Sequence, residues 1–196
     1  MAKNMQPVLK RCRTLGVSPA AMGYNKTSNK NPGGQRRAKK SEYATQLTEK
    51  QKVKFVYGIQ EKQFRNYYEK AARMPGNTGD NLLTLVERRL DNVVYRAGFG
   101  MSRRQARQLV LHRHFTVNGE RVNIPSYLVK PGDVIAVHGS ACDKIKENVE
   151  LDSARPVPMW MSFEANDMKV TFNRLPERSE IDLDVEEHLI VELYSK

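Results

Sequence analysis

An amphipathic stripe between Asn81 and Ala97 constrains the fold more than any other stretch of this chain. Its apolar residues recur at helical spacing, which predicts one helix that begins at 78–80 and buries a single face. These residues are Leu82, Leu85, Val86, Leu90, Val93, Val94 and Ala97. Gly98 and Gly100 follow, and glycine readily adopts the left-handed conformation in which many helices end. The rest of the chain must therefore cover one side of this helix.

A shorter helix with two distinct faces is predicted directly after these glycines. Ser102 and Gln105 have the spacing of a capping box, in which each side chain satisfies a free backbone N–H of the first turn. Apolar residues and arginines fall on different arcs of this helix: Ala106, Leu109 and Val110 on one, and Arg103, Arg104 and Arg107 on the other. One face therefore belongs to the core, and the other is cationic.

The arginines stand where the first turn of a helix already carries about half a positive charge. Cations gathered there repel one another and the helix dipole unless an anion lies among them. The free N–H groups of a helix N-terminus also bind phosphate, so backbone and guanidinium donors can converge on one oxyanion. We therefore predict a phosphate-binding face, with a solvated basic surface as the alternative.

Two turn motifs predict a small antiparallel sheet after this helix. Asn118-Gly119 lies between short apolar segments and suits a type I′ turn, in which both central residues need positive φ. Pro131-Gly132-Asp133 predicts a second turn before the apolar run 134–137. Two helices should therefore pack on this sheet.

The stretch from Arg89 to Val137 resembles a known family. It reads RLDNVVYRAGFGMSRRQARQLVLHRHFTVNGERVNIPSYLVKPGDVIAV and is similar to the small RNA-binding module named after small-subunit ribosomal protein four. That module also occurs in pseudouridine synthases, tyrosyl-tRNA synthetases and a heat-shock protein. By itself the resemblance implies binding to structured RNA, without saying which RNA.

Positive charge is concentrated in the first part of the chain. The net charge is +11, but residues 1–114 hold 24 Lys and Arg against 7 Asp and Glu, whereas residues 115–196 hold 9 against 15. This asymmetry indicates a polyanionic partner, and nucleic acid is the commonest one. No apolar run approaches the length of a membrane helix, and none has the place of a signal peptide. We expect a cytoplasmic protein without membrane contact.

The two cysteines, Cys12 and Cys142, lie far apart and have no further thiol or histidine nearby. They cannot build a disulfide framework or a zinc knuckle. We expect free thiols, no metal site and no cofactor.

Residues 1–40 are basic and poor in large apolar groups, and Pro32-Gly33-Gly34 opposes regular structure. We predict an arm that becomes ordered mainly on RNA, with a disordered tail as the alternative. Its candidate phosphate contacts are Lys10, Arg11, Arg13, Arg36, Arg37, Lys39 and Lys40.

Helical propensity is high from Glu42 to Met74, with an interruption near Gly58. The second half of this segment is predicted to form a helix with a charged face and an apolar face. The charged face carries Lys62, Arg65, Glu69 and Arg73, and the apolar face carries Phe64, Tyr67, Tyr68 and Ala71. Farther on, we predict a helix at 142–152 and two strands at 159–163 and 168–172, with Trp160 in the core. The last segment, 185–193, has helical spacing, although a strand is an alternative.

Two further segments extend the resemblance to about residues 41–196. KFVYGIQEKQFRNYYEKAARMPGNTGDNLLTLVERRLDNVVYRAGFG and FNRLPERSEIDLDVEEHLIVELYSK resemble small-subunit ribosomal protein four of bacterial type. This family implies an α+β fold. A mainly helical domain, 41–87 with about 176–196, would accompany an inserted α+β module at 88–175, with two or three helices on a small antiparallel sheet.

The resemblance also implies a function, that of a structural component of the small ribosomal subunit. Such a protein is a primary binder of 16S ribosomal RNA at a junction in the 5′ domain, and it nucleates subunit assembly. It also acts with ribosomal protein five near the channel through which mRNA enters, and so contributes to translational accuracy. The implied RNA-binding residues are Lys52, Lys54, Gln63, Arg65 and Tyr68 in the helical domain, which Arg73 joins on the basic side of its helix, and Arg103, Arg104, Arg107 and Gln108 in the module.

Two other functional classes are alternatives. An RNA-modifying enzyme would need a catalytic domain of roughly 200 residues beside the module, and the chain has no room for one. A free RNA chaperone of the heat-shock type fits the module but not the additional segments at either end. The chain also departs from the family: it lacks the N-terminal zinc-binding cysteines, has Lys54-Phe55 where many members have two basic residues, and is shorter and less basic after Val137.

Overall fold

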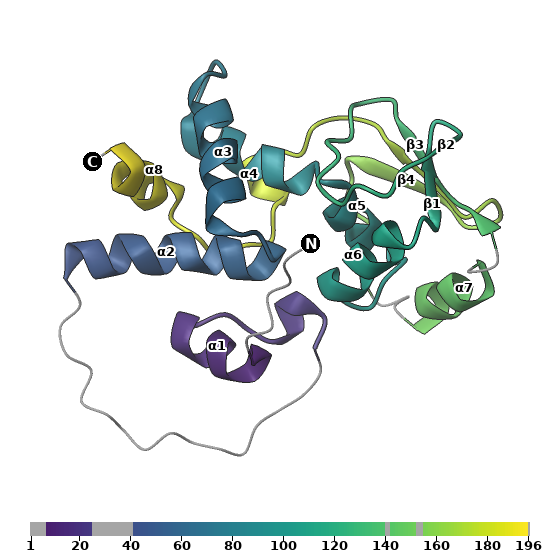
Figure 1. The fold of residues 1–196 in the computed structure, drawn as a ribbon, viewed down its shortest axis with the longest axis horizontal. Helices are drawn as coiled ribbons and strands as arrows, with labels where there is room; N and C mark the ends of the chain where they lie inside the picture. The colour runs from purple at the N-terminus through teal and green to yellow at the C-terminus, as the bar shows by residue number, and fades with distance from the viewer. Residues whose placement is uncertain (1–6, 25–40, 140–141, 152–154, 196) are drawn as a thin grey trace. The chain divides into compact units, whose positions relative to one another are not determined.

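The computed structural model describes residues 7–24, 41–139, 142–151 and 155–195, which belong to two compact units (Figure 1). The helical unit comprises Met1–Asn81 and Leu183–Lys196, and the module comprises Leu82–Asp182. The predicted division was 41–87 with about 176–196 against 88–175. Helices combined with an antiparallel sheet confirm the α+β prediction. In the described ranges, no helix is both long and apolar enough to cross a membrane.

The main part of the helical unit is built from α2 (Glu42–Tyr57), α3 (Glu61–Ala72) and α8 (Glu187–Ser195). Gly58 follows α2 in the left-handed conformation, with φ 64°, so the predicted interruption is confirmed. α8 packs against α2 (Figure 1), and the rings of Tyr194 and Tyr68 stack with their centroids 4.7 Å apart. The C-terminal segment is therefore a helix, and the alternative strand is wrong.

Part of the predicted N-terminal arm is regular structure. Residues 7–24 form α1 (Val8–Leu15) and a 3-10 turn, η1 (Ala20–Met22), and their buried side chains pack around Phe55 of α2. Cys12 and Leu15 of α1 and Met22 of η1 supply this small core together with Phe55. Burial raises the pKa of the free Cys12 thiol. The remaining candidates of the arm, Arg36, Arg37, Lys39 and Lys40, lie outside the described residues.

The amphipathic stripe is divided between two helices, so the prediction of one helix is wrong. α4 (Thr78–Glu87) ends before Arg88, and α5 (Leu90–Arg96) begins after Arg89, whose backbone is extended. At this break the chain bonds to a distant segment: the N–H of Val129 donates to the carbonyl of Arg88, and the N–H of Leu90 donates to that of Tyr127. All seven predicted stripe residues are nevertheless buried. So short a break leaves the helical spacing intact, and the pattern could not reveal it.

The module contains an antiparallel sheet with the strand order β2-β1-β3-β5-β4. Its strands are β1 (Phe115–Val117), β2 (Glu120–Arg121), β3 (Val134–Val137), β4 (Met161–Glu164) and β5 (Lys169–Phe172). The predicted turns are confirmed, since Asn118, Gly119 and Gly132 all have positive φ. Val117 pairs with Ile135, which pairs in turn with Val170, so the buried side chains of three strands share one face.

The helices α6 (Arg103–Leu111) and α7 (Cys142–Leu151) complete the module. α6 packs against α5, and Trp160 is 1% exposed in the shared core, as predicted. The capping box is only half correct. Ser102 accepts a hydrogen bond from the N–H of Gln105, but the Gln105 side chain accepts from the N–H of Met101 instead of that of Ser102.

A buried ion pair lies at the start of α5. The Arg89 side chain is 0% exposed, and its guanidinium makes two bonds to Asp91: Nε to Oδ1 at 3.0 Å and Nη2 to Oδ2 at 2.7 Å. Both charges are removed from water, so loss of one partner leaves the other charge buried without compensation.

We expect Asp91→Asn to lower the free energy of unfolding of the module by about 3–5 kcal/mol, because Arg89 would stay charged and buried. Urea unfolding followed by fluorescence isolates the module, since Trp160 is the only tryptophan. The matched control is Asp182→Asn. Asp182 pairs with Arg96, but its side chain is 86% exposed, so about 0–1 kcal/mol is expected. Equal losses in the two variants would contradict the importance of the buried pair.

A second charged cluster ties α2, α3 and α8 together within the helical unit. Glu61 accepts hydrogen bonds from Lys50 at 2.9 Å, from Lys54 at 2.5 Å and from the hydroxyl of Tyr194 at 2.8 Å. Partial burial would raise the pKa of Glu61, but the bonds from these three residues outweigh it and lower that pKa to about 2. Burial and the hydrogen bond to Glu61 also raise the pKa of Tyr194.

This cluster predicts a pH dependence. The folded pKa of Glu61 lies below its ordinary value of 4.5, so its ionised form contributes stability that is complete above pH 4.5 and is lost as the pH falls toward 2. Glu61→Gln should therefore destabilise the helical unit at pH 7, and its difference from the unmodified protein should shrink between pH 4.5 and 2. Far-UV circular dichroism in urea measures this. Glu69→Gln, which removes an exposed pair with Arg65, should show no such convergence, and a difference for Glu61→Gln that stays constant with pH would disprove the role of the cluster.

Candidate nucleic-acid interface

The N-terminal half of α6 presents the arginines that the sequence singled out. Ala106 and Val110 are fully buried, which fixes the rotation of the helix. Arg104 and Gln108 are exposed, and Arg103 is half-buried at the first position of α6. The predicted separation into a core face and a cationic face is confirmed.

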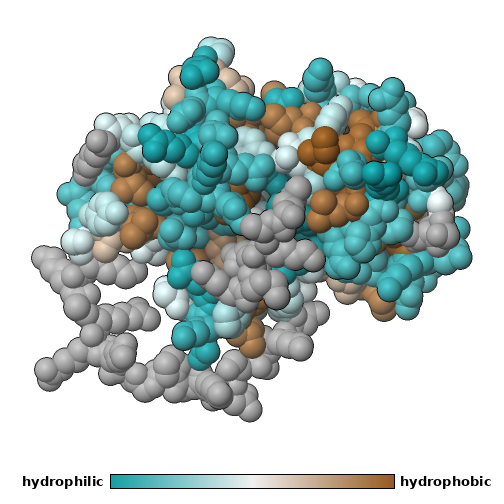
Figure 2. Space-filling view, viewed as in Figure 1, coloured by the Kyte–Doolittle hydropathy of each residue, from teal (hydrophilic) through white to brown (hydrophobic). Residues whose placement is uncertain are grey.

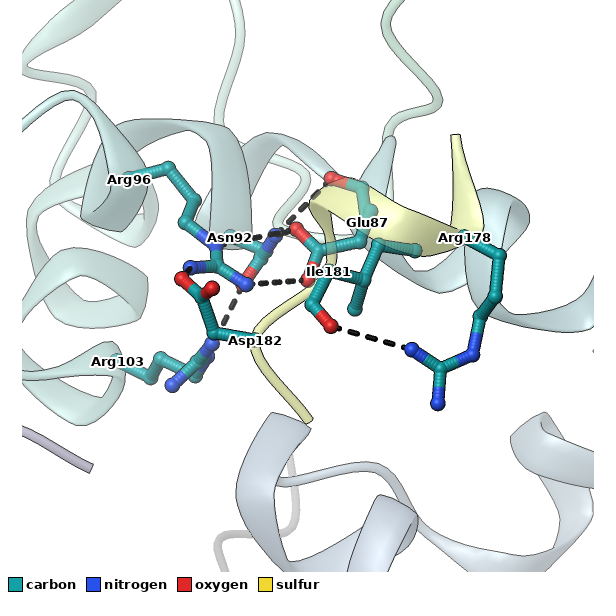
Figure 3. A network of polar contacts seen from close by, with 7 residues as sticks. All are labelled: Glu87, Asn92, Arg96, Arg103, Arg178, Ile181 and Asp182. Atoms are coloured by element: carbon teal, nitrogen blue, oxygen red, sulfur yellow. Dashed lines mark hydrogen bonds and ion pairs between the residues drawn. The ribbon is translucent and has the colours of Figure 1, made fainter. Parts of the chain in front are cut away.

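Arg103 is held by two residues of α5. Its Nε donates to the side-chain oxygen of Asn92 at 3.0 Å, and its guanidinium lies 4.3 Å from the centroid of the Tyr95 ring. Asn92 in turn donates to both the main-chain oxygen and the carboxylate of Glu87 (Figure 3). The arginine therefore ends a chain of polar contacts that begins in α4.

Glu87 is a buried carboxylate whose charge is balanced by Arg96. The Nη2 of Arg96 lies 2.8 Å from Glu87, and its Nη1 lies 3.3 Å from Asp182. Arg178 donates to the carbonyl of Ile181 at 3.2 Å and so fixes the segment that carries Asp182 (Figure 3). The last segment of the module is thus attached to the same network.

Arg107 also contacts α5. Its Nη1 lies 3.3 Å from Oδ2 of Asp91, the residue that holds the buried Arg89. Asp91 and Asn92 are neighbours in the sequence, and each contacts one arginine of α6. The positions of both arginines therefore depend on α5.

Arg155 also packs on the Tyr95 ring. This guanidinium lies 4.1 Å from the ring centroid and donates to the carbonyls of Tyr95, at 3.0 Å, and of Met101, at 3.4 Å. The sequence analysis missed Asn92, Tyr95 and Arg155. No periodic signal could have found them, since Asn92 and Tyr95 contact Arg103 across the turn between two helices, and Arg155 reaches Tyr95 and Met101 from a distant segment.

The RNA-binding residues predicted in the helical unit fall into two groups, those exposed at its surface and those engaged in contacts within it. Lys10, Arg13, Arg65 and Arg73 are exposed, and Gln63 is half-buried. The Arg65 side chain is 70% exposed although it lies 3.4 Å from Glu69 on the same helix. These side chains lie at the surface of α1 and α3 or, for Arg73, directly after α3.

Other predicted contacts of this unit are engaged inside it. Lys52 pairs with Glu49 at 2.7 Å, and its side chain is 18% exposed, while Lys54 is 13% exposed beside Glu61. Tyr68 stacks on Tyr194, and its hydroxyl lies 3.3 Å from the Ser195 hydroxyl. Arg11 donates to Gln51 of α2 at 3.2 Å. Lys54, Tyr68 and Arg11 thus connect different helices of the unit, whereas Lys52 pairs within α2, and the sequence did not indicate these contacts.

The visible surface of the protein is mainly polar. Figure 2 shows hydrophilic residues over most of the visible face, with hydrophobic residues in separate patches. Among the described residues, the exposed large hydrophobic side chains are Tyr43 on α2, Leu151 on α7, and Ile124, Met159 and Leu175 in connecting segments. No group of His, Cys, Asp and Glu among the described residues is placed to hold a metal ion. Burial and the neighbouring His112 lower the pKa of His114, which lies beyond the end of α6, below its ordinary value. The charged residues of α6 itself are arginines.

Two family models match adjoining parts of the chain. The model described as S4 domain matches residues 88–135, and the model described as ribosomal protein S4/S9 N-terminal domain matches residues 3–87. Small ribosomal subunit protein uS4 of Agathobacter rectalis is 53% identical over 198 residues, which cover 100% of both chains. The chain belongs to the uS4 family of small ribosomal subunit proteins.

Other members of the family are similarly close. The uS4 protein of Pelotomaculum thermopropionicum is 60% identical over 165 residues, covering 83% of this chain and 79% of its own length. That of Acinetobacter baylyi is 54% identical over 185 residues, covering 92% and 89%. The chain is thus a structural ribosomal protein of the small subunit with an RNA-binding S4 domain, and it is not an enzyme.

Most of the arginine network described above lies within the S4 domain. Glu87, Arg155 and the segment around Asp182 lie outside it. α5, α6 and the first three strands lie inside residues 88–135 or begin there. Helices α1 to α3 lie in the N-terminal domain of the uS4 family. The two sets of exposed cations therefore belong to two different domains of one family.

Proposed function

We propose that this uS4-family chain is a primary binder of 16S ribosomal RNA in the cytoplasmic small subunit. It contacts a junction of several RNA helices in the 5′ domain and nucleates assembly there. Family membership supports a ribosomal RNA partner. The observation that carries the proposal is the face of α6, where Arg103, Arg104 and Arg107 supply donors beside the N-terminus of their own helix.

The proposed mechanism is electrostatic capture followed by recognition of shape. The deep major groove of A-form RNA hides its base edges from side chains, so a folded basic surface recognises the arrangement of phosphates and riboses. Each phosphate that is neutralised releases counterions and makes affinity salt-dependent. Because the helical unit and the module each present exposed cations, the chain can contact more than one RNA helix.

The C-terminal part of the chain supports a second component of the proposal, namely contact with ribosomal protein five near the channel through which mRNA enters. Within the helical unit, Asp184 and Glu186 are exposed, while Leu183 and Val185 beside them are buried. An acidic strip of this kind repels RNA and suits a basic protein surface. Calorimetry with purified protein five tests it: Asp184→Lys should weaken binding, and unchanged affinity would overturn the acidic contact.

Equilibrium binding to a 16S 5′-domain RNA tests the main proposal. An unrelated structured RNA of equal length is the competitor, and the titration is repeated across a salt series. We expect tight binding that survives competition and moderate salt. Equal affinity for both RNAs, lost together as salt increases, would overturn the proposal.

Within the same assay, we expect Arg104→Ala to weaken binding and to flatten the slope of log K against log salt by about 0.7–0.9, the contribution of one phosphate contact. The matched control is Lys146→Ala, an exposed cation on α7, which should leave the slope unchanged. An unchanged slope for Arg104→Ala would show that the arginine is solvated in the complex.

A further inference from the structure

We propose that Asn92 and Tyr95 of α5 are positioning residues for Arg103, which they hold in its RNA-binding geometry before RNA arrives. The inference rests on the proposed function, since it requires Arg103 to contact RNA. Neither residue can contact RNA extensively itself, because Asn92 is 2% exposed and Tyr95 is 4% exposed. Both must act through the arginine that they touch.

The orientation of the Asn92 amide is determined by its neighbours. Its nitrogen donates to the Glu87 main-chain oxygen at 3.1 Å and to the Glu87 carboxylate, both of which can only accept. A flipped amide would place its oxygen against these acceptors. The amide oxygen must therefore face away from Glu87, and there it accepts from Nε of Arg103 at 3.0 Å.

Glu87 is itself fixed. Its side chain is 0% exposed, and Arg96 bonds it through Nη2 at 2.8 Å and Nε at 3.3 Å. Balanced in this way, the carboxylate can remain a charged acceptor inside the module. The chain of contacts from Arg96 through Glu87 and Asn92 to Arg103 consists of side chains with defined donors and acceptors at every step (Figure 3).

Tyr95 supplies a surface for the guanidinium plane. Arg103 lies 4.3 Å from the ring centroid, within the range of a cation–π contact. Arg155 packs on the same ring at 4.1 Å and donates to the Tyr95 carbonyl, so a second guanidinium restrains the ring. Asn92 thus fixes one edge of the guanidinium, and Tyr95 supports one of its faces.

The consequence concerns the cost of binding. A long side chain normally loses rotamer freedom when it is immobilised on a ligand, which weakens association. For Arg103, this freedom is already restricted when the module folds. Release of Arg103 by substitution in α5 should therefore weaken RNA binding by about two- to tenfold, while the charge, and so the salt slope, is retained.

The test is a set of double-mutant cycles in the 16S 5′-domain binding assay. Asn92→Ala and Tyr95→Leu are each combined with Arg103→Ala, and Tyr95→Phe is the matched control that keeps the ring. We expect Asn92→Ala and Tyr95→Leu each to weaken binding with an unchanged salt slope. Neither should weaken binding further when Arg103 is already replaced by alanine. Tyr95→Phe should bind normally. Trp160 fluorescence verifies that the module is folded in each variant. If Asn92→Ala unfolds the module, the comparison of Tyr95→Leu with Tyr95→Phe tests the inference.

Three results separate the possible failures. Equal losses with and without Arg103 would show that α5 acts on the fold in general and would overturn the inference. Arg103→Ala without effect, alongside specific 16S binding, would overturn the inference but leave the proposed function intact. Failure of the unmodified protein to prefer the 16S RNA would overturn the proposed function itself.

Discussion

The buried ion pair between Arg89 and Asp91 is the interaction on which the module depends. A fully buried guanidinium is costly unless a partner and hydrogen bonds compensate it, and Asp91 supplies two bonds from the first turn of α5. The extended backbone at Arg89 bridges to Leu128 and ends the preceding helix. The pair therefore fixes where α5 begins, and with it the side chains that α5 turns toward α6.

α5 connects this interior charge with the cationic surface. Asp91 contacts Arg107, and its neighbour Asn92 contacts Arg103. Arginines in the first turns of a helix oppose the helix dipole, and an acceptor from the adjacent helix offsets part of that penalty. The fold thus tolerates a concentration of donors at α6 that an isolated helix would not favour. A phosphate group is the natural further partner of such donors.

Local patterns predicted most of the elements, and long-range contacts explain the errors. Positive φ at Asn118 and Gly119 and the burial of Ala106 and Val110 followed from residue type and spacing. The break at Arg89 did not, because it is stabilised by a segment about 40 residues later in the chain, at Tyr127 to Val129. The sequence also did not indicate that Lys54 pairs with Glu61 across the Gly58 turn, and its contact with RNA stays a prediction. Sequence indicated which residues carry charge, but only the structure shows which of them are already paired.

Side-chain ¹⁵Nε relaxation of the free protein would test most directly whether α5 holds Arg103 in place. Arg89, which is fully buried, and Arg65, which is 70% exposed, provide rigid and mobile references in the same molecule. We predict that the order parameter of Arg103 Nε lies near that of Arg89 and falls toward that of Arg65 in Asn92→Ala. An Arg103 as mobile as Arg65 in the unmodified protein would contradict the account.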